Sequence, residues 1–220
     1  VMRDIEAKRA TINLQALKAD FEKREAARLE SLKGDLEKMI DATPSLRQFK
    51  NQMLLDLTSE GLRIQIVDEK NRPMFDSASS ELKPYTKQIL REIGAALNKV
   101  DNRISLSGHT DAAPYAGGDK GFGNWELSTN RANASRREMV AGGMEDAKIM
   151  RVVGLASTVL YDKGDPFNPI NRRISIIVMN KRTEEAILRD GTVAEVEGED
   201  AGSQTVEAAA SLPAGAAGSR

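Results

Sequence analysis

The feature that most restricts the fold is a repeated change between two hydrophobic periods along residues 61–180. The stretches GLRIQIVDE, RISLSG and NRRISIIVMN alternate apolar and polar side chains, as half-buried strands do. IMRVVGLAS favours a further strand, while residues 84–99 and the segment NWELSTNRANASRREM carry apolar residues at helical spacing. Helices that alternate with strands pack on one face of a small mixed sheet, so we expect an α/β (α+β) two-layer sandwich.

Residues 1–42 predict a long N-terminal helix, because they are highly charged and contain no proline. Their larger apolar side chains recur at gaps of three and four in two runs that are out of register with each other. The runs are Leu14, Leu17 and Phe21, then Leu29, Leu32, Leu36 and Met39. Such a stripe either pairs with another helix, as in a coiled coil, or belongs to a solvated spacer. We favour pairing, and therefore a homodimer.

The predicted organisation is a helical linker over 1–42, a folded domain over 43–182 and a flexible tail over 183–220. The linker should end at ATPS, because the residue before Pro44 is pushed out of the helical region. A second helix is expected next, with one apolar face made by Leu46, Phe49, Met53 and Leu57. In the tail, TEEAILRDG favours one or two helical turns, and the composition of residues 192–220 predicts disorder.

Composition argues against several classes of function. The 32 basic and 33 acidic side chains give a net charge of −1, so no overall field attracts nucleic acid. The absence of cysteine excludes thiolate chemistry and disulfides. No apolar run approaches the roughly 20 residues that span a bilayer, and the charged start is unlike a signal peptide. We expect a soluble chain that is a fragment of a longer gene product.

The stretch SGHTDAAPYAGGDKGFGNWELSTNRANASRR holds the strongest functional candidates. His109 and Asp111 lie two residues apart at the end of a strand, where a base and its orienting carboxylate could share a face. However, no serine or cysteine nucleophile stands in a strained elbow, and there is no second histidine for a metal site. We therefore expect no enzyme activity and no cofactor or metal, with His109 hydrogen-bonded at the strand end.

Asp111 and Arg131 are better candidates for binding. Ser128 suits a helix N-cap, which would place Arg131 in the first turn, near the loop that carries Asp111. Arg136 falls on another flank of the helix and is expected to brace the fold or a partner surface. A carboxylate beside a guanidinium makes a socket for a zwitterion, because one binds an ammonium and the other a carboxylate. The alternative is that Asp111 and Arg131 only bridge each other.

The ordered motifs SGHTD, NWELSTNRA and NPINRRISIIV, within residues 60–180, resemble the OmpA-like peptidoglycan-binding domain. The resemblance implies a non-enzymatic anchor in the periplasm whose partner is the diaminopimelate-containing stem peptide of peptidoglycan. It assigns ligand contacts to Thr110, Asp111, Asn124, Arg131 and Arg173. It assigns support of the site to Ser128, Arg136 and Arg172.

Two features depart from the family pattern. The insert PYAGGDKGFG at 114–123 is expected to cover or move the socket, and Ser135 replaces a usually apolar residue, which predicts looser helix packing. Three other interpretations stay open. They are a periplasmic anchor of an outer-membrane protein, a wall-remodelling hydrolase that uses His109 and Asp111, and a coiled-coil scaffold that carries the domain as a passenger.

Overall fold

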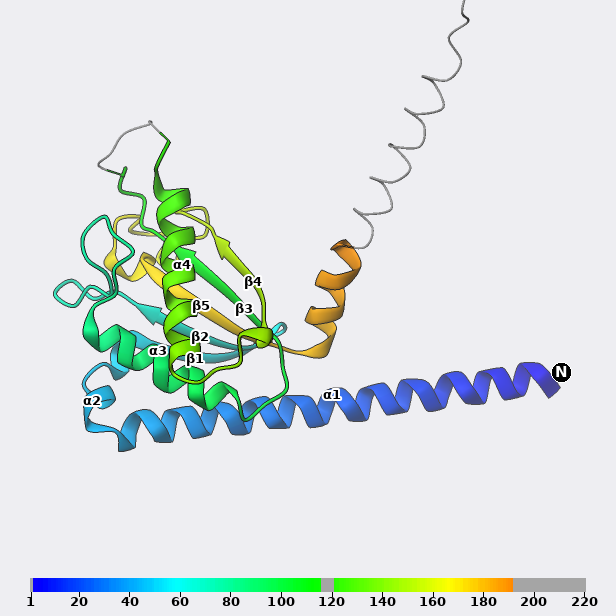
Figure 1. The fold of residues 1–220 in the computed structure, drawn as a ribbon. Coiled ribbons are helices and arrows are strands. Elements are labelled where there is room, and N and C mark those ends of the chain that lie inside the picture. Colours follow the sequence, from blue (N-terminus) through cyan, green and yellow to red (C-terminus); the bar gives the residue numbers. More distant parts are fainter. Residues whose placement is uncertain (1, 116–120, 192–220) are drawn as a thin grey trace, which may run out of the picture. The chain divides into compact units, whose positions relative to one another are not determined.

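The computed structural model describes residues 2–115 and 121–191 (Figure 1). It divides into two units, residues 1–181 and residues 182–220. In the second unit, residues 182–191 are helical, as TEEAILRDG predicts. Residues 192–220, for which we predicted disorder, lie outside the described residues. So does part of the insert at 114–123. No helix within the described ranges is long and apolar enough to cross a membrane.

The first unit is built on a five-stranded mixed sheet with the order β1-β2-β5-β3-β4. The strands are β1 (Met53–Thr58), β2 (Gly61–Val67), β3 (Ile104–His109), β4 (Ile149–Gly154) and β5 (Arg173–Met179). β3 and β4 are parallel, and the other three neighbouring pairs are antiparallel. This order makes β2, β5 and β3 neighbours although long segments separate them in the sequence, so the ends of these strands can form one site.

Helices α3 (Pro84–Leu97) and α4 (Asn124–Ala141) lie across one face of the sheet (Figure 1). The apolar side chains on that face of the strands are almost fully buried beneath them, among them Ile64, Leu106 and Ile176. Gly108 on β3 allows α4 to approach closely, because a methyl group there would collide with the backbone carbonyl of Ser128. The expected two-layer sandwich is confirmed.

The long N-terminal helix is also confirmed, as α1 (Met2–Ala42). Its two apolar runs have different surroundings. Leu29, Leu32, Leu36 and Ile40 are buried in the same hydrophobic core as the sheet. Leu14, Leu17 and Phe21 are 55%, 67% and 46% exposed. The change of register between the two runs therefore marks the point where α1 begins to pack against the domain.

The prediction of a second helix through Met53 and Leu57 is wrong. Only the short helix α2 (Pro44–Arg47) and the 3-10 turn η1 (Lys50–Gln52) precede β1 in this part of the described chain. Residues 53–58 instead form a hairpin with β2, whose turn uses Gly61 at a φ of 135°. Pairing with the apolar strand β2 outweighs the helical spacing of four side chains, because strand formation depends on its neighbours.

Candidate ligand-binding site

A cavity of about 480 Å³ opens where the loop after β3 meets the beginning of α4. Four of the five predicted ligand contacts line this cavity: Thr110, Asp111, Asn124 and Arg131. Thr110 and Asp111 follow the last residue of β3, and the other two belong to α4. The chain order β3, loop, α4 thus brings a carboxylate and a guanidinium to the same hollow.

The carboxylate of Asp111 is held in place from two sides. Its Oδ1 accepts a hydrogen bond from the backbone N–H of Ala113 at 3.1 Å, and its Oδ2 accepts one from Nη1 of Arg172 at 2.7 Å. Arg172 also donates from Nε to Oδ2 of Asp68 at 2.7 Å. Asp111 is therefore bonded to Arg172 rather than to Arg131. The structure thus does not favour the alternative that Asp111 and Arg131 only bridge each other.

Asp68 is a site residue that the sequence analysis missed. It follows β2, its side chain is 4% exposed, and its Oδ1 accepts the backbone N–H of Met74 at 2.7 Å. Burial raises the pKa of Asp68, while its bonds to Arg172 and Met74 act in the opposite direction. The signal was an acidic residue directly after a predicted strand, but the sequence did not show that this strand lies beside β5.

Arg131 lies against the ring of Phe75, and both residues line the cavity. Its guanidinium lies 4.7 Å from the ring centre of Phe75, and its Nε donates to the carbonyl of Ser79 at 2.9 Å. Burial lowers the pKa of Arg131, and the carboxylates of Asp68 and Asp111 partly offset this effect. Because two guanidinium groups and two carboxylates meet here, the site suits a ligand that carries both charges.

The model of the OmpA family matches residues 74–168. In the fold, these residues contain α3, β3, α4 and β4.

Individual relatives agree with this match. Motility protein B of Escherichia coli (strain K12) is 47% identical over 178 residues, which cover 81% of this chain and 57% of that protein. The chain thus spans little more than half the length of that relative. The periplasmic domain of Helicobacter pylori MotB superposes with a TM-score of 0.52 at 17% identity, covering 65% of this chain and 91% of that one. The predicted resemblance to the OmpA family is confirmed.

The fold also occurs in the cell wall anchor of the T6SS from Pseudomonas aeruginosa, with a TM-score of 0.50 at 23% identity. The match covers 60% of this chain and 90% of that one. At these identities, the two structural matches show that the fold is shared.

Helix α4 begins earlier in the sequence than predicted. The N-cap is Gly123, whose N–H donates to Oε2 of Glu126 at 2.7 Å, so the prediction that Ser128 caps the helix is wrong. Ser128 is fully buried one turn later, where its hydroxyl accepts the N–H of Ala156 at 3.0 Å. Arg131 consequently lies beyond the first turn. The side chain of Asn124 donates to the carbonyl of Ala113 at 2.8 Å, which ties the helix to the loop of Asp111.

The two arginines at the start of β5, Arg172 and Arg173, have positions opposite to those expected. Arg173 does not line the cavity: its guanidinium donates to Oε1 of Gln65 at 3.0 Å and to the carbonyl of Val159 at 2.9 Å. Arg172, expected only as support, lines the cavity and contacts Asp111. The reason is that successive side chains of an extended chain point to opposite faces of the sheet.

His109 lies outside the cavity, paired across the sheet with Arg173. It is 5% exposed, and its Nε2 is 3.2 Å from the hydroxyl of Ser107. Burial, together with the charge of Arg173, lowers the pKa of His109 to about 4. The imidazole is therefore neutral near pH 7 and does not meet the carboxylate of Asp111, so the geometry gives no support to a base built from these two residues.

The remaining helix predictions concern support of the site. Arg136 pairs with Asp146 at an Nη1–Oδ1 distance of 2.5 Å, which braces α4 against the turn before β4. Ser135 is fully buried, and its hydroxyl donates to the carbonyl of Arg131 at 2.9 Å. The polar residue is thus accommodated by a bond within its own helix rather than by exposure.

Proposed function

We propose that this domain is a non-enzymatic anchor that binds peptidoglycan and holds the stator of a flagellar motor to the cell wall. The observation that carries the proposal is the shared cavity of Asp111 and Arg131. A diaminopimelate side chain carries an ammonium and a carboxylate on one carbon. Its ammonium would bind the carboxylate of Asp111, and its carboxylate would bind the guanidinium of Arg131.

Two neutral residues complete the proposed site. The hydroxyl of Thr110 is buried at the cavity without a hydrogen-bond partner among the described residues. Because buried hydroxyl groups are normally satisfied, we propose that ligand binding opens this hydroxyl to a polar ligand atom. Asn124 fixes the loop on which Asp111 lies, and Arg172 keeps the Asp111 carboxylate in one orientation by bonding to both Asp111 and Asp68.

The motor role is supported by the 47% identity to Motility protein B. In this proposal the domain is the periplasmic part of a single-pass inner-membrane protein of a Gram-negative bacterium, and the proton channel is formed together with MotA. A proton-driven ring can turn a rotor only if the stator is held still, so the domain would transmit the reaction torque to the wall. The proposal includes a contact with the flagellar P-ring.

The proposal also includes a homodimer formed through α1. Leu14, Leu17 and Phe21 leave a stripe of apolar surface exposed on a helix whose other half is buried in the domain. A second copy of the helix would bury this stripe, as in a short coiled coil. The apolar surface removed from water would stabilise the pair.

Co-sedimentation with purified sacculi tests the wall-binding part of the proposal. We expect Asp111→Asn to reduce the bound fraction at least tenfold, because the amide keeps the shape of the site and loses the charge. Asp56→Asn is the matched control, since Asp56 pairs with Arg63 on the hairpin and does not line the cavity. Equal binding by wild type and Asp111→Asn would contradict the proposal, and release of soluble muropeptides would indicate a hydrolase instead.

The alternative of an outer-membrane protein's periplasmic anchor makes the same prediction for sacculi. It differs in the cell, because loss of the gene would then leave swimming intact. We expect the deletion strain to lose motility, and the Asp111→Asn variant to fail to restore it although the protein is present in the membrane fraction.

A further inference from the structure

The turn that follows β2 forms part of the wall of the ligand cavity, because it carries Asp68 and Lys70. The backbone on both sides of this turn is held by one side chain from a distant part of the sequence. Nε2 of Gln52 donates to the carbonyl of Val67 at 2.9 Å and to the carbonyl of Arg72 at 3.0 Å. Gln52 therefore ties the two ends of the turn together.

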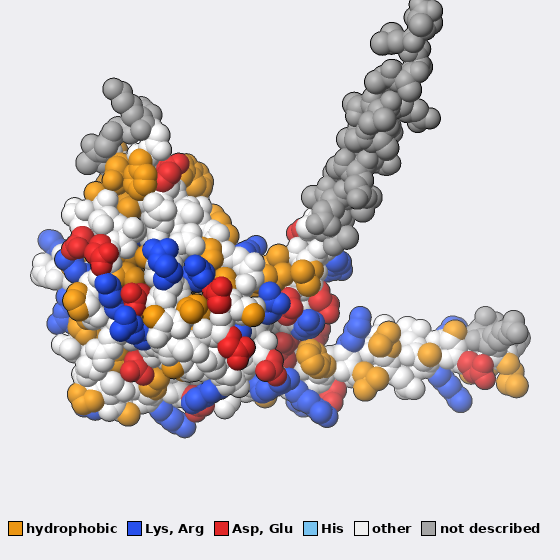
Figure 2. Space-filling view, viewed as in Figure 1, with side chains coloured by type: hydrophobic (Ala, Val, Ile, Leu, Met, Phe, Trp, Pro, Cys, Tyr) orange, Lys and Arg blue, Asp and Glu red, His pale blue; other side chains and the backbone are white. Residues whose placement is uncertain are grey.

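The burial of Gln52 is unusual for an amide. Charged side chains of both signs are spread over the face of the first unit seen in Figure 2, whereas Gln52 is fully buried. Its Oε1 has no hydrogen-bond partner among the described residues, and an unbonded buried oxygen costs free energy. An apolar side chain would fill the same space without that cost. Packing alone therefore does not explain the amide, and its two bonds to the turn supply a reason for it.

Further contacts join the same two segments. Nη1 of Arg72 donates to the carbonyl of Gln48 at 2.8 Å, and its guanidinium lies 5.7 Å from the ring centre of Phe49. The Phe49 ring stacks on Tyr85 with centroids 4.3 Å apart, and the Tyr85 hydroxyl donates to the carbonyl of Arg72 at 2.9 Å. The segment before β1 thus fixes the turn through several contacts, of which the bonds of Gln52 are the most buried.

The position of the turn decides the position of the charged groups in the cavity. The N–H of Asp68 donates to the carbonyl of Arg172 at 3.0 Å, and its Oδ2 accepts Nε of Arg172 at 2.7 Å. Arg172 in turn donates to the carboxylate of Asp111 at 2.7 Å. Such bonds weaken steeply as their distance and angle depart from the optimum. A displaced Asp68 would therefore release Arg172, and Asp111 would lose the partner that orients it.

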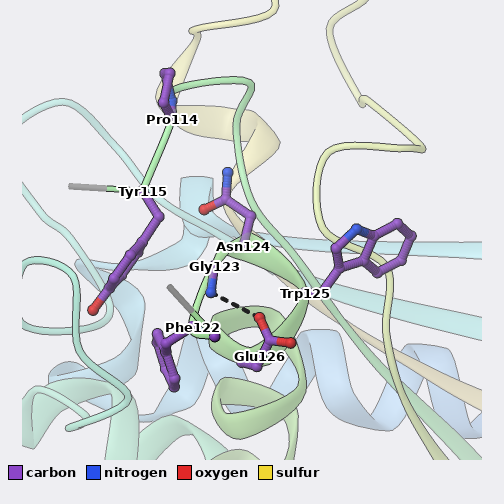
Figure 3. Close-up of a pocket in the computed structure, with 8 residues that line it drawn as sticks. Pro114, Tyr115, Phe122, Gly123, Asn124, Trp125 and Glu126 are labelled. Atoms are coloured by element: carbon purple, nitrogen blue, oxygen red, sulfur yellow. Dashed lines mark hydrogen bonds between the residues drawn. The ribbon is translucent and has the colours of Figure 1, made fainter. Parts of the chain in front are cut away.

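The far end of the same segment is fixed differently. The hydroxyl of Tyr115, whose ring is drawn in Figure 3, donates to the carbonyl of Ala78 at 3.1 Å. Nε of Arg131 donates to the carbonyl of Ser79 at 2.9 Å. Tyr115 and Arg131 themselves line the cavity, whereas Gln52 does not. Any effect of Gln52 on a ligand must therefore act through the turn.

We infer that Gln52 is a positioning residue of the ligand site. By holding both ends of the turn after β2, it keeps Asp68 against Arg172, and this contact orients the carboxylate of Asp111. The inference rests on the proposed function, because Asp111 is there a ligand contact. Gln52 lies outside residues 74–168, to which the OmpA-family model matches, so it extends the site beyond that match.

Replacing Gln52 with methionine tests the inference, because methionine has a similar volume and donates no hydrogen bond. We would measure the Kd for a soluble diaminopimelate-containing stem peptide by calorimetry, at a temperature at which circular dichroism shows every variant to be folded. The Kd should rise at least fivefold in Gln52→Met. Asn102→Leu is the matched control, because the half-buried amide of Asn102 donates to the carbonyl of Met179 and does not line the cavity. It should keep the Kd within twofold of wild type.

A double-mutant cycle separates positioning from a general loss of structure. If Gln52 acts through Asp68, then Gln52→Met should change the Kd less than twofold in a protein that already carries Asp68→Asn. Additive effects of the two substitutions would overturn the inference. So would a Kd of Gln52→Met within twofold of wild type.

Hydrogen exchange tests the positioning without a ligand. The amide of Met74 donates to Oδ1 of Asp68, so it should exchange at least tenfold faster in Gln52→Met, relative to the amide of Ile176 in β5. Equal acceleration at both amides, or none at Met74, would overturn the inference. If the wild type binds no peptide while Met74 alone is accelerated, the proposed function fails and the positioning of Asp68 by Gln52 stands.

Discussion

Replacing Arg172 with methionine should destabilise the domain, because Asp68 would keep a buried charge without its partner. Arg172 bonds to Asp68 and Asp111 at 2.7 Å each, and the side chain of Asp68 is 4% exposed. Removing one partner of a buried ion pair costs about 3–5 kcal/mol. Since the Arg172 side chain is 28% exposed, we expect a smaller loss of about 2–3 kcal/mol at pH 7.5. This corresponds to a fall in melting temperature of about 4–12 °C.

The loss of stability in Arg172→Met should be smaller at acidic pH than at pH 7.5. Burial raises the pKa of Asp68, and Arg172 opposes that shift, so the pKa of Asp68 should rise further in Arg172→Met. A carboxyl group whose pKa is raised in the folded state binds its proton there first. Folded-state stability attributable to this group therefore increases as the pH falls through that pKa. The stability difference from wild type should accordingly be smaller at pH 5.0 than at pH 7.5.

Urea unfolding at both pH values, followed by circular dichroism, measures this difference. Arg63→Met is the matched control, because Arg63 pairs with Asp56 at 2.5 Å in a partly exposed position on the hairpin. That variant should lose less than about 1 kcal/mol at either pH. The reasoning is refuted if Arg172→Met loses no more stability than Arg63→Met, or if its loss is the same at both pH values.

Three further perturbations test other parts of the fold. Gly108→Ala should lower the free energy of unfolding by about 1–3 kcal/mol, because the added methyl group collides with α4. Gly34→Ala, which adds a methyl group in open space on α1, should raise the free energy of unfolding by about 0.5–1 kcal/mol. Equal effects of the two substitutions in thermal unfolding would contradict the packing of β3 against α4. Wild-type stability should fall between pH 6.5 and 4 because the pKa of His109 is lowered, and His109→Gln should show a shallower fall in urea midpoints. Joint replacement of Leu17 and Phe21 by glutamine should weaken self-association in sedimentation analysis and leave the melting temperature of the domain unchanged.

The core strands could be predicted from the sequence because their burial repeats along the chain. Ile64, Leu106 and Ile176 lie on the core face of three strands, and each belongs to an alternating stretch. The strand β1 could not be predicted, since its side chains fit helical spacing and its conformation depends on pairing with β2. Similarly, α1 carries two apolar runs, but the sequence alone did not show that only the second run meets the domain.

The site could be predicted in part for a comparable reason. Asp111 and Arg131 lie in one continuous motif, so the sequence indicated that they face the same cavity. Asp68 and Arg172 come from the end of β2 and the start of β5, and they join the site through the strand order β2-β5-β3. No local pattern records that order. Whether Arg172 or Arg173 lines the cavity likewise depends on which face of the sheet each side chain occupies at the start of β5.

The measurement that tests the central claim most directly is isothermal titration of the wild-type protein with two soluble stem peptides that differ at one residue. One peptide carries diaminopimelate, with an ammonium and a carboxylate at the side-chain end, and the other carries lysine, with an ammonium only. If the cavity of Asp111 and Arg131 binds a zwitterion, the diaminopimelate peptide should bind at least tenfold more tightly. Equal affinity for the two peptides, or no binding of either, would contradict the account.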